Sequence, residues 1–390
     1  GPRCVRGPLF SFPGVMSSFQ PRGPRSLVWN LGLPYDDRVI LETNGATVLS
    51  RRTFAALLAA TATAGFAACS GRSDQTNPTD GSGSSGDAFP VTIKHALGEA
   101  VIKQKPERIA TLGWSNHEVP LALGVVPVGM RKTTWGDDDS DGLMPWVKEK
   151  IDALGGQTPV LFDDTSGIPF EQVADTKPDV ILAALSGITA EEYATLSKVA
   201  PVVAYPEAPW ITTLEQMIDL DARGMGMAEQ GRKLAEDLDK QIADVVGKYP
   251  DLKGKKVLFS WLNASDLSKI SFYTTGDQRV AFLINKVGMV APQVVTDESA
   301  KAAAFSVEIP AENSDRFDDV DLLITYAPND PAPLRDAMKA SPLIARIPAV
   351  AADRVVFLGQ DPLGNSATPS PLSIPWGLDT YIAKLAEGLK

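Results

Sequence analysis

Side chains that could carry out nucleophilic or metal chemistry are scarce in this sequence. The 390 residues include only two cysteines, Cys4 and Cys69, and two histidines, His95 and His117. Both cysteines precede the region that we interpret as the folded body, so structural disulfides, thiolate metal sites and cysteine nucleophiles are not expected there. Two imidazoles also make a zinc or manganese site hard to assemble. We interpret each histidine as an exposed or capping residue.

Carboxylate pairs are the remaining candidates for acid–base catalysis. They occur at Asp163 with Asp164 and at Asp318 with Asp319, but adjacent acids in loops are usually solvated. The sequence has neither a G-x-S-x-G nucleophile elbow nor a G-x-x-x-x-G-K-[ST] phosphate loop. Residues 81–86 match the dinucleotide pattern G-x-G-x-x-G, yet no strand precedes them and no helix follows. We expect a protein that is not an enzyme, with an enzyme of unknown reaction as a remote alternative.

The overall charge favours a small ligand or a protein partner and argues against nucleic acid. The formal net charge is -11 and the sequence pI is about 4.8. Nucleic-acid binding requires clusters of lysine and arginine that neutralise phosphates, and such clusters are not seen. With 44% hydrophobic and 22% charged residues, the chain can bury a sizeable core, and its length suits two lobes.

A charged segment, an apolar segment and a small-residue segment precede Cys69 in that order. Arg51 and Arg52 stand before an apolar run at 55–64, which is too short to cross a bilayer, since that needs about 20 residues. The arginines resemble a twin-arginine export signal, and the Phe-Ala-Ala-Cys ending at Cys69 resembles the lipobox of bacterial lipoproteins. In that family the cysteine is acylated, which implies export and a lipid anchor on the outer face of the cell membrane. The alternative is a disordered tail with a cysteine by chance.

Composition and periodicity divide the chain into successive segments. They are 1–49, an upstream, non-native or mis-started segment; 50–69, the lipoprotein signal; 70–87, a flexible tether; 88–210, an N-terminal α/β lobe; 211–249, a linking helix; and 250–390, a C-terminal α/β lobe. The tether is rich in small and polar residues, which bury too little apolar area to offset the entropy of ordering.

Short apolar runs alternate with helical patterns on both sides of the linker. This alternation predicts two Rossmann-like α/β lobes with parallel sheets, the second repeating the organisation of the first. The expected strands are 91–95, 100–102, 108–112, 125–130, 179–184 and 202–205, then 256–261, 320–325 and 354–358. The expected helices are 118–123, 189–199, 278–287, 334–340 and 375–389.

The segment between the lobes has helical periodicity without an internal proline. Apolar residues such as Leu214, Met217, Leu234 and Leu238 recur at spacings of three, four or seven. A single helix over 212–248 would be roughly 55 Å long, enough to cross both lobes. The alternative is two helices broken near Gly224 and Gly226.

Several short stretches, in this order and spacing, resemble the class III, helical-backbone periplasmic binding proteins for ferric siderophores, haem and cobalamin. They are Pro106–Ile109 (PERI), Leu123–Gly129 (LGVVPVG), Phe170–Val173 (FEQV), Lys177–Ile181 (KPDVI) and Ser370–Leu378 (SPLSIPWGL). The resemblance extends over 88–390. It implies two lobes that hold a ligand between them and deliver it to the permease of an ABC importer, and we expect a monomer.

The resemblance also implies that loops at the carboxyl ends of the strands contact the ligand. In this sequence those loops are expected to carry Trp114, Arg131, Trp135, Trp210, Trp261, Tyr273, Arg279, Tyr326 and Trp376. Aromatic rings offer rigid apolar faces, and arginine offers fixed donors to the oxygens around a bound metal. For each aromatic alone, core packing remains the alternative, as a surface position does for each arginine.

Two acidic residues are implied as docking sites for arginines of the permease. By motif position they are Glu171 in Phe170–Val173 and Glu308 in Ser306–Ile309. Such pairs guide encounter and register more than affinity. The alternative for each is a solvated carboxylate, and for Glu308 the nearby Glu312 could serve as well.

The implied ligand is a ferric siderophore that keeps its iron fully ligated, so we expect no cofactor and no direct metal ligand from the protein. Some siderophore binders of this family have an arginine where this chain reads 162–167, Phe-Asp-Asp-Thr-Ser-Gly. Together with 137–139 that stretch predicts an acidic rim, which favours a neutral or cationic ferric hydroxamate over a catecholate. Haem or cobalamin is the alternative, with Tyr273, Tyr326 or His117 near an axial position.

Overall fold

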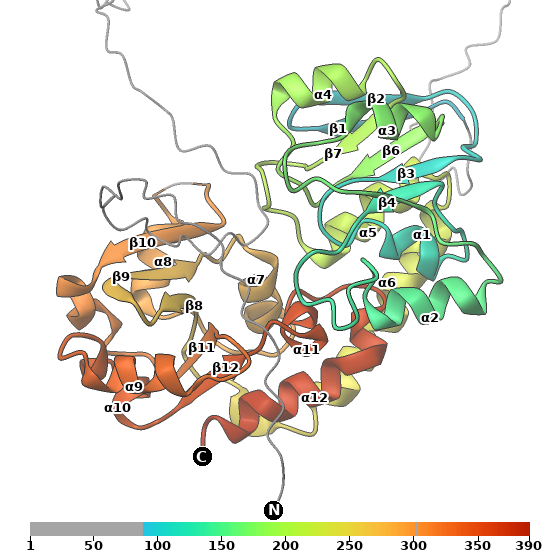
Figure 1. Cartoon of the computed structure of the whole chain (residues 1–390). Coiled ribbons are helices and arrows are strands. Elements are labelled where there is room, and N and C mark those ends of the chain that lie inside the picture. Colours follow the sequence, from blue (N-terminus) through green and yellow to red (C-terminus); the bar gives the residue numbers. More distant parts are fainter. Residues whose placement is uncertain (1–88, 302) are drawn as a thin grey trace, which may run out of the picture.

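The computed structural model describes residues 89–301 and 303–390. The predicted upstream segment at 1–49, the signal at 50–69 with its Cys69, and the tether at 70–87 all lie outside this part of the chain. Within it, two α/β lobes are connected by helices along one side, which confirms the predicted fold class (Figure 1). Among the described residues, no helix combines the length and the apolar character needed to cross a membrane.

The N-terminal lobe is built on a five-stranded parallel sheet in the order β5-β4-β3-β6-β7. An antiparallel hairpin of β1 (Val91–His95) and β2 (Gly98–Ile102) lies beside β7. The sheet strands β3, β6 and β7 are buried at every position, as their apolar sequences predict for a sheet covered on both faces. The other elements are β3 (Ile109–Thr111), α1 (Glu118–Ala122), β4 (Gly129–Arg131), α2 (Pro145–Ala153), β5 (Val160–Phe162), α3 (Phe170–Asp175), β6 (Val180–Ala183), α4 (Ala190–Leu196) and β7 (Val202–Ala204).

The C-terminal lobe has a mixed sheet, in the order β10-β9-β8-β11-β12, where a parallel one was predicted. β8, β11 and β12 are parallel, but β9 and β10 add antiparallel neighbours. The cause is the tight connection between β8 and β9, in which Asn263 accepts the Ser265 N–H at 3.0 Å, because so short a connection can join only antiparallel strands. The strands are β8 (Val257–Asn263), β9 (Asp266–Tyr273), β10 (Ser306–Pro310), β11 (Leu322–Tyr326) and β12 (Val355–Leu358). The helices are η1 (Pro250–Leu252), α7 (Gln278–Asn285), α8 (Gln293–Ser299), η2 (Ala311–Phe317), α9 (Ala332–Ala340), η3 (Ile344–Arg346), α10 (Pro348–Ala351), α11 (Pro362–Ser366) and α12 (Ser373–Glu387).

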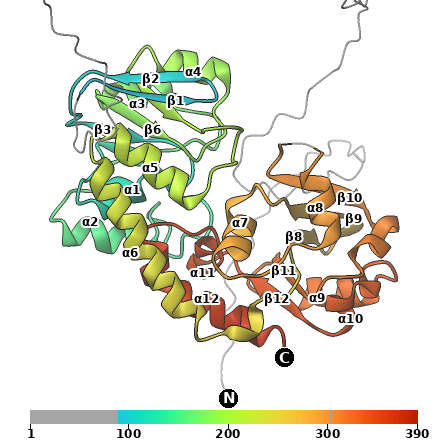
Figure 2. The same cartoon turned by 180° about the vertical axis from the view of Figure 1, so that it is seen from behind.

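The linker is two helices, α5 (Leu214–Gly224) and α6 (Ala228–Val246), so the prediction of one long helix was wrong. Gly226 has φ +66°, a left-handed conformation that ends α5, and a Cβ there would lie 2.4 Å from the ring of Phe89. The break lets α5 stay against the N-terminal lobe while α6 runs along α12 (Figure 2). At about 1.5 Å per residue, α6 is roughly 28 Å long.

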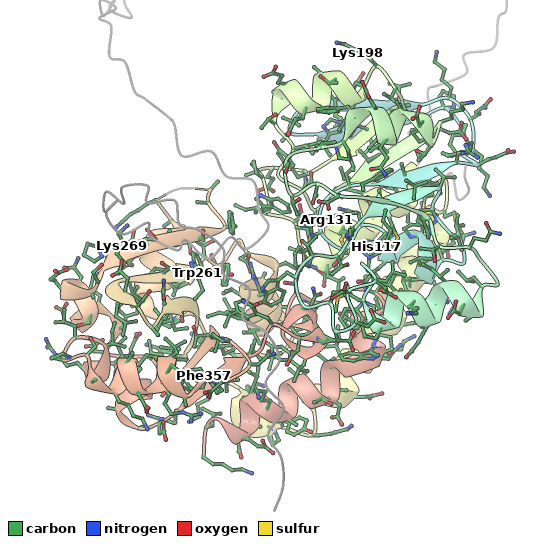
Figure 3. The ribbon with its side chains drawn as sticks, in the orientation of Figure 1. His117, Arg131, Lys198, Trp261, Lys269 and Phe357 are labelled. Carbon is green, nitrogen blue, oxygen red and sulfur yellow. The ribbon has the colours of Figure 1, made fainter. Side chains whose placement is uncertain are left out.

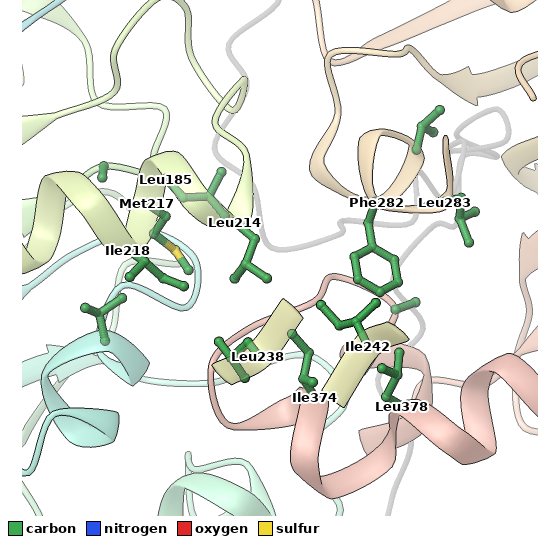
Figure 4. Packing of buried hydrophobic residues seen from close by; sticks show 14 of the residues in the cluster. Leu185, Leu214, Met217, Ile218, Leu238, Ile242, Phe282, Leu283, Ile374 and Leu378 are labelled. Atoms are coloured by element: carbon green, nitrogen blue, oxygen red, sulfur yellow. The ribbon is translucent and has the colours of Figure 1, made fainter. Parts of the chain in front are cut away.

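One apolar cluster continues through both lobes and the helices between them (Figure 4). It contains Leu185, Leu214, Met217, Ile218, Leu238, Ile242, Phe282, Leu283, Ile374 and Leu378 among others. Each such side chain contributes about 1.5–3 kcal/mol when fully buried. Large opening of the lobes would expose this shared core, so we expect small motions between them.

Candidate ligand-binding site

A cleft of about 710 Å³ lies between the lobes and takes side chains from both. It is lined by Trp114, Arg131, Trp135, Leu185 and Trp210 of the N-terminal lobe, by Tyr273, Asp277, Gln278, Arg279, Phe305 and Tyr326 of the C-terminal lobe, and by Thr368. Aromatic rings and two guanidinium groups therefore face one another across the space between the lobes.

The carboxyl ends of the strands place these side chains. Trp114 follows β3, Arg131 ends β4 and Tyr326 ends β11, and open α/β sheets bind ligands at this edge. Gly113 has φ +76°, and a Cβ there would lie 2.4 Å from the Leu185 carbonyl oxygen. The Trp114 N–H donates to that same oxygen at 2.9 Å. Glycine at 113 thus lets the end of β3 close onto the end of β6 and sets the direction of Trp114.

Arg131 is held by a carboxylate from the next strand. Its Nε–H donates to both oxygens of Asp164, at 2.8 and 3.0 Å, and Asp164 follows β5. The guanidinium carbon lies 5.3 Å from the centre of the Trp114 ring. The side chains of this ion pair are 10% and 16% exposed, so solvent screens the two charges weakly.

Arg279 has a matching arrangement in the C-terminal lobe. Its Nε and Nη2 donate to Asp277 at 2.8 and 2.7 Å, its guanidinium carbon lies 3.4 Å from the centre of the Tyr273 ring, and its Nη1 lies 3.5 Å from the Tyr326 hydroxyl oxygen. Burial is the largest single influence and opposes its charge, but Asp277, Tyr273 and Tyr326 together outweigh burial and raise the pKa of Arg279 well above its usual value. Burial raises the pKa of both Tyr273 and Tyr326, so the phenols keep their protons. The site presents a cation beside two neutral hydroxyl groups.

All but two of the side chains predicted to contact a ligand line this cleft. Trp261 does not line it but packs on Tyr273, with ring centres 4.6 Å apart. Trp376 lies on α12, 4.8 Å from the ring of Trp146, and lines a separate groove between α6 and α12. Figure 3 shows Arg131 and Trp261 in different lobes. Ligand contact by the cleft residues stays a prediction.

The cleft also contains residues that the sequence reasoning missed, namely Leu185, Asp277, Gln278, Phe305 and Thr368. For Asp277 a signal existed, because an aspartate just before a helical pattern is a typical N-cap, and Asp277 caps α7. Phe305 precedes β10, a strand that was not predicted. Thr368 lies far along the chain in an irregular segment.

Residues 365–373, which run from the end of α11 through this irregular segment to the start of α12, cross between the lobes and are called the crossing segment below. The Asn365 side chain donates to the Trp135 carbonyl at 2.8 Å, and the Gln278 side chain donates to the Pro369 carbonyl at 2.8 Å. Through these bonds the crossing segment ties the N-terminal wall of the cleft to α7 of the C-terminal wall.

Glu118, on α1 of the N-terminal lobe, binds the crossing segment through its side chain. Its carboxylate accepts the Trp146 indole N–H at 2.9 Å, the Leu372 N–H at 3.0 Å and the Ser370 hydroxyl. Burial raises the pKa of Glu118 from 4.5 to about 7 despite these bonds. A buried carboxyl group thus connects the two parts of the molecule.

His117 lies beside Glu118 and lines a small polar cavity, outside the main cleft. Its ring nitrogens have no hydrogen-bond partner among the described residues. Burial lowers the pKa of His117 to about 4, with Arg131 adding to the effect. Of the residues considered for a haem axial position, the cleft contains Tyr273 and Tyr326 but not His117.

The two predicted docking glutamates are both exposed, one on each lobe. Glu171 lies in the first turn of α3. Glu308 lies on β10 and accepts a bond from Lys269 at 3.0 Å. Exposure is compatible with docking, and contact with a permease stays a prediction.

Two of the acidic residues that the sequence placed at the rim, Asp139 and Asp164, are paired with cations. Asp164 is paired with Arg131. Asp139 and Asp141 of the loop before α2 both bind the Lys148 ammonium group. Arg131 and Lys148 therefore neutralise part of the negative charge that the sequence placed here.

The two-lobed architecture and the cleft between strand ends define a solute-binding protein, and the chain belongs to the periplasmic binding protein family, which it matches over residues 109–362. It is 26% identical over 228 residues to the probable siderophore-binding lipoprotein YfiY of Bacillus subtilis. That match covers 58% of this chain, and the chain spans 62% of the length of this curated relative.

Two solved structures extend the comparison. The structure of Streptococcus pneumoniae TIGR4 PiaA in complex with ferrichrome has a TM-score of 0.73 and 40% identity, covering 76% of this chain and 98% of that one. A periplasmic solute-binding protein from Mycobacterium smegmatis has a TM-score of 0.62 and 27% identity, covering 77% and 99%.

Proposed function

We propose that this protein captures a ferric siderophore between its lobes, with a hydroxamate preferred, and delivers it to the permease of an ABC importer. The observation that carries the proposal is Arg279, whose guanidinium group lies over the Tyr273 ring and beside the Tyr326 hydroxyl in a cleft that three tryptophans also line. The similarity of the chain to a ferrichrome-bound protein and to a probable siderophore-binding lipoprotein supports the same ligand class.

Capture requires no bond from the protein to the metal. The guanidinium groups and phenols donate hydrogen bonds to the metal-bound oxygens of the ligand, while the rings cover its organic backbone. The iron stays inside its chelate throughout, so the protein contributes recognition and transfer but no chemical step.

Titration of tryptophan fluorescence against a panel of ligands tests the proposal. The panel comprises ferric hydroxamates, catecholates and carboxylates, haem and cobalamin. We expect ferrichrome to quench the fluorescence strongly, because Trp114, Trp135 and Trp210 line the cleft. A shifted Soret band with haem, together with no response to ferric hydroxamates, would contradict the proposal.

We further propose that residues 50–69 direct export and that acylated Cys69 anchors the protein to the outer face of the membrane. Residues 70–87 would then form a flexible tether between this anchor and the two lobes, at 88–210 and 250–390. We propose that the protein is a monomer. The lipobox-like sequence before Cys69 and the lipoprotein name of the relative support this arrangement. Mass spectrometry of the membrane fraction should find diacylated Cys69 at the mature N-terminus.

Glu171→Ala is expected to leave ferrichrome affinity unchanged and to reduce ferrichrome import by about fivefold or more, because a docking charge is lost while the cleft is intact. The measurement is uptake of radiolabelled ferrichrome by cells that make the variant. Glu191→Ala is the matched control, since Glu191 is also exposed in the first turn of a helix. Loss of ligand affinity in Glu171→Ala would show that the docking assignment is wrong.

A further inference from the structure

The ionised side chains of the cleft form two guanidinium–carboxylate pairs. Arg131 binds Asp164, and Arg279 binds Asp277, all at 3.0 Å or less. Among the described residues that line the cleft, the ionised ones are Arg131, Arg279 and Asp277, and Asp164 contributes its charge through Arg131. Both positive charges are therefore cancelled by a carboxylate in direct contact.

A cavity without net charge discriminates among ferric complexes by the charge of the complex. Three hydroxamate groups cancel the charge of Fe³⁺, whereas three catecholates leave a triple negative charge. Transfer of that anion from water into a neutral cavity is unfavourable, because no counter-charge replaces the lost hydration. A neutral complex needs only hydrogen-bond donors, which a paired guanidinium group still supplies.

We infer that Asp164 and Asp277 are specificity-determining residues, which tune the cleft to uncharged ferric hydroxamates and reject anionic ferric catecholates. The inference rests on the proposed function and deepens it by naming the residues that set the ligand charge. Asp164 acts on the ligand site through Arg131, whereas Asp277 lines the cleft beside Arg279, and each changes the electrostatic potential in the cleft.

Asparagine can replace either aspartate with little change of shape. Asp277 caps α7 by accepting the Arg279 backbone N–H at 2.9 Å, and asparagine is an equally good N-cap. An asparagine at 164 keeps one oxygen as an acceptor for the Arg131 Nε–H. The substitutions therefore remove one negative charge each and keep a hydrogen bond to arginine.

The experiment measures the affinities of Asp164→Asn, Asp277→Asn and the double variant by tryptophan fluorescence quenching. The probes are ferrichrome and the ferric complex of a synthetic tris-catecholate, each at low and at moderate ionic strength. We expect each single variant to bind the catecholate about tenfold or more tightly than the wild type, with gains that multiply in the double variant. Ferrichrome affinity should change much less than catecholate affinity, because a neutral complex responds weakly to the added charge.

Two controls separate charge from structural disturbance. Asp163→Asn removes the adjacent carboxylate, which is exposed and bonded to Thr165, and should change neither affinity appreciably. The catecholate gain of the cleft variants should shrink as salt increases, which a mere change of shape would not do.

The outcomes are distinguishable. If the wild type binds the catecholate as tightly as ferrichrome, or if the folded variants gain nothing for it, the inference is overturned while siderophore binding stands. If the wild type binds no ferric complex at all, both the inference and the proposed function are overturned.

Discussion

Arg279→Ala is expected to weaken ferrichrome binding about 100-fold in fluorescence-quenching titrations. The Arg279 guanidinium group lies over the Tyr273 ring and beside the Tyr326 hydroxyl, and charge-assisted hydrogen bonds are worth about 1.5–3 kcal/mol each. Loss of about 3 kcal/mol corresponds to roughly a 100-fold change in Kd. The rings of the cleft remain, so some binding should persist.

The same substitution leaves Asp277 buried without its cation, so a second variant is needed to separate affinity from folding. Asp277→Asn combined with Arg279→Ala removes the uncompensated charge and should restore stability without restoring affinity. The matched control is Arg335→Ala, because Arg335 also lies over an aromatic ring, that of Phe357, but away from the cleft. Unchanged ferrichrome affinity in the folded double variant would show that Arg279 does not bind the ligand.

The strands that the sequence predicted best are those with continuous apolar runs. β6 and β11 are buried at every position, and burial on both faces leaves no polar residue to obscure the pattern. β9 was missed because its first half, Asp266–Lys269, is largely exposed and polar, and only its second half is buried. Without β9 the hairpin could not be recognised, and the sheet was taken as wholly parallel.

The linker shows a different limit of sequence patterns. The apolar spacing from Leu214 to Leu238 continues with little change through the break, because both helices pack on the same core. The break falls at Gly226, which has a left-handed φ and lies against the ring of Phe89, a residue far away in the chain. The spacing of apolar residues shows which face of a helix is buried. It does not show where one helix ends and the next begins when both bury similar faces.

The sequence predicted those residues of the candidate site that lie at the ends of strands. Trp114 and Arg131 were found because each stands where an apolar run ends. Thr368 could not be found this way, since the crossing segment is placed by side-chain bonds such as that of Asn365 to Trp135. Trp376 was taken from a motif, and the helix that contains it turns the indole onto Trp146.

Glu118→Gln is expected to lower the free energy of unfolding by about 2 kcal/mol at pH 5, because an amide places an NH₂ group where the protonated carboxyl group has an oxygen that can still accept a hydrogen bond. Either the Trp146 or the Leu372 N–H would face an NH₂ group, and an unsatisfied buried donor costs about 1–3 kcal/mol. Denaturant unfolding followed by circular dichroism measures the difference. Glu149→Gln, at an exposed position on α2, is the control and should change little.

The pH dependence of that difference is the sharper test. The folded state holds the Glu118 proton up to about pH 7, whereas the unfolded chain releases it near 4.5, so wild-type stability falls as pH rises through this window. The loss amounts to about 3 kcal/mol, and glutamine does not titrate. Neutral His117, whose pKa is lowered to about 4, stabilises less as pH falls, but this effect is common to both proteins and cancels in the comparison. By pH 8 the variant should therefore equal or exceed the wild type in stability, and a pH-independent difference would show that Glu118 is ionised in the folded protein throughout.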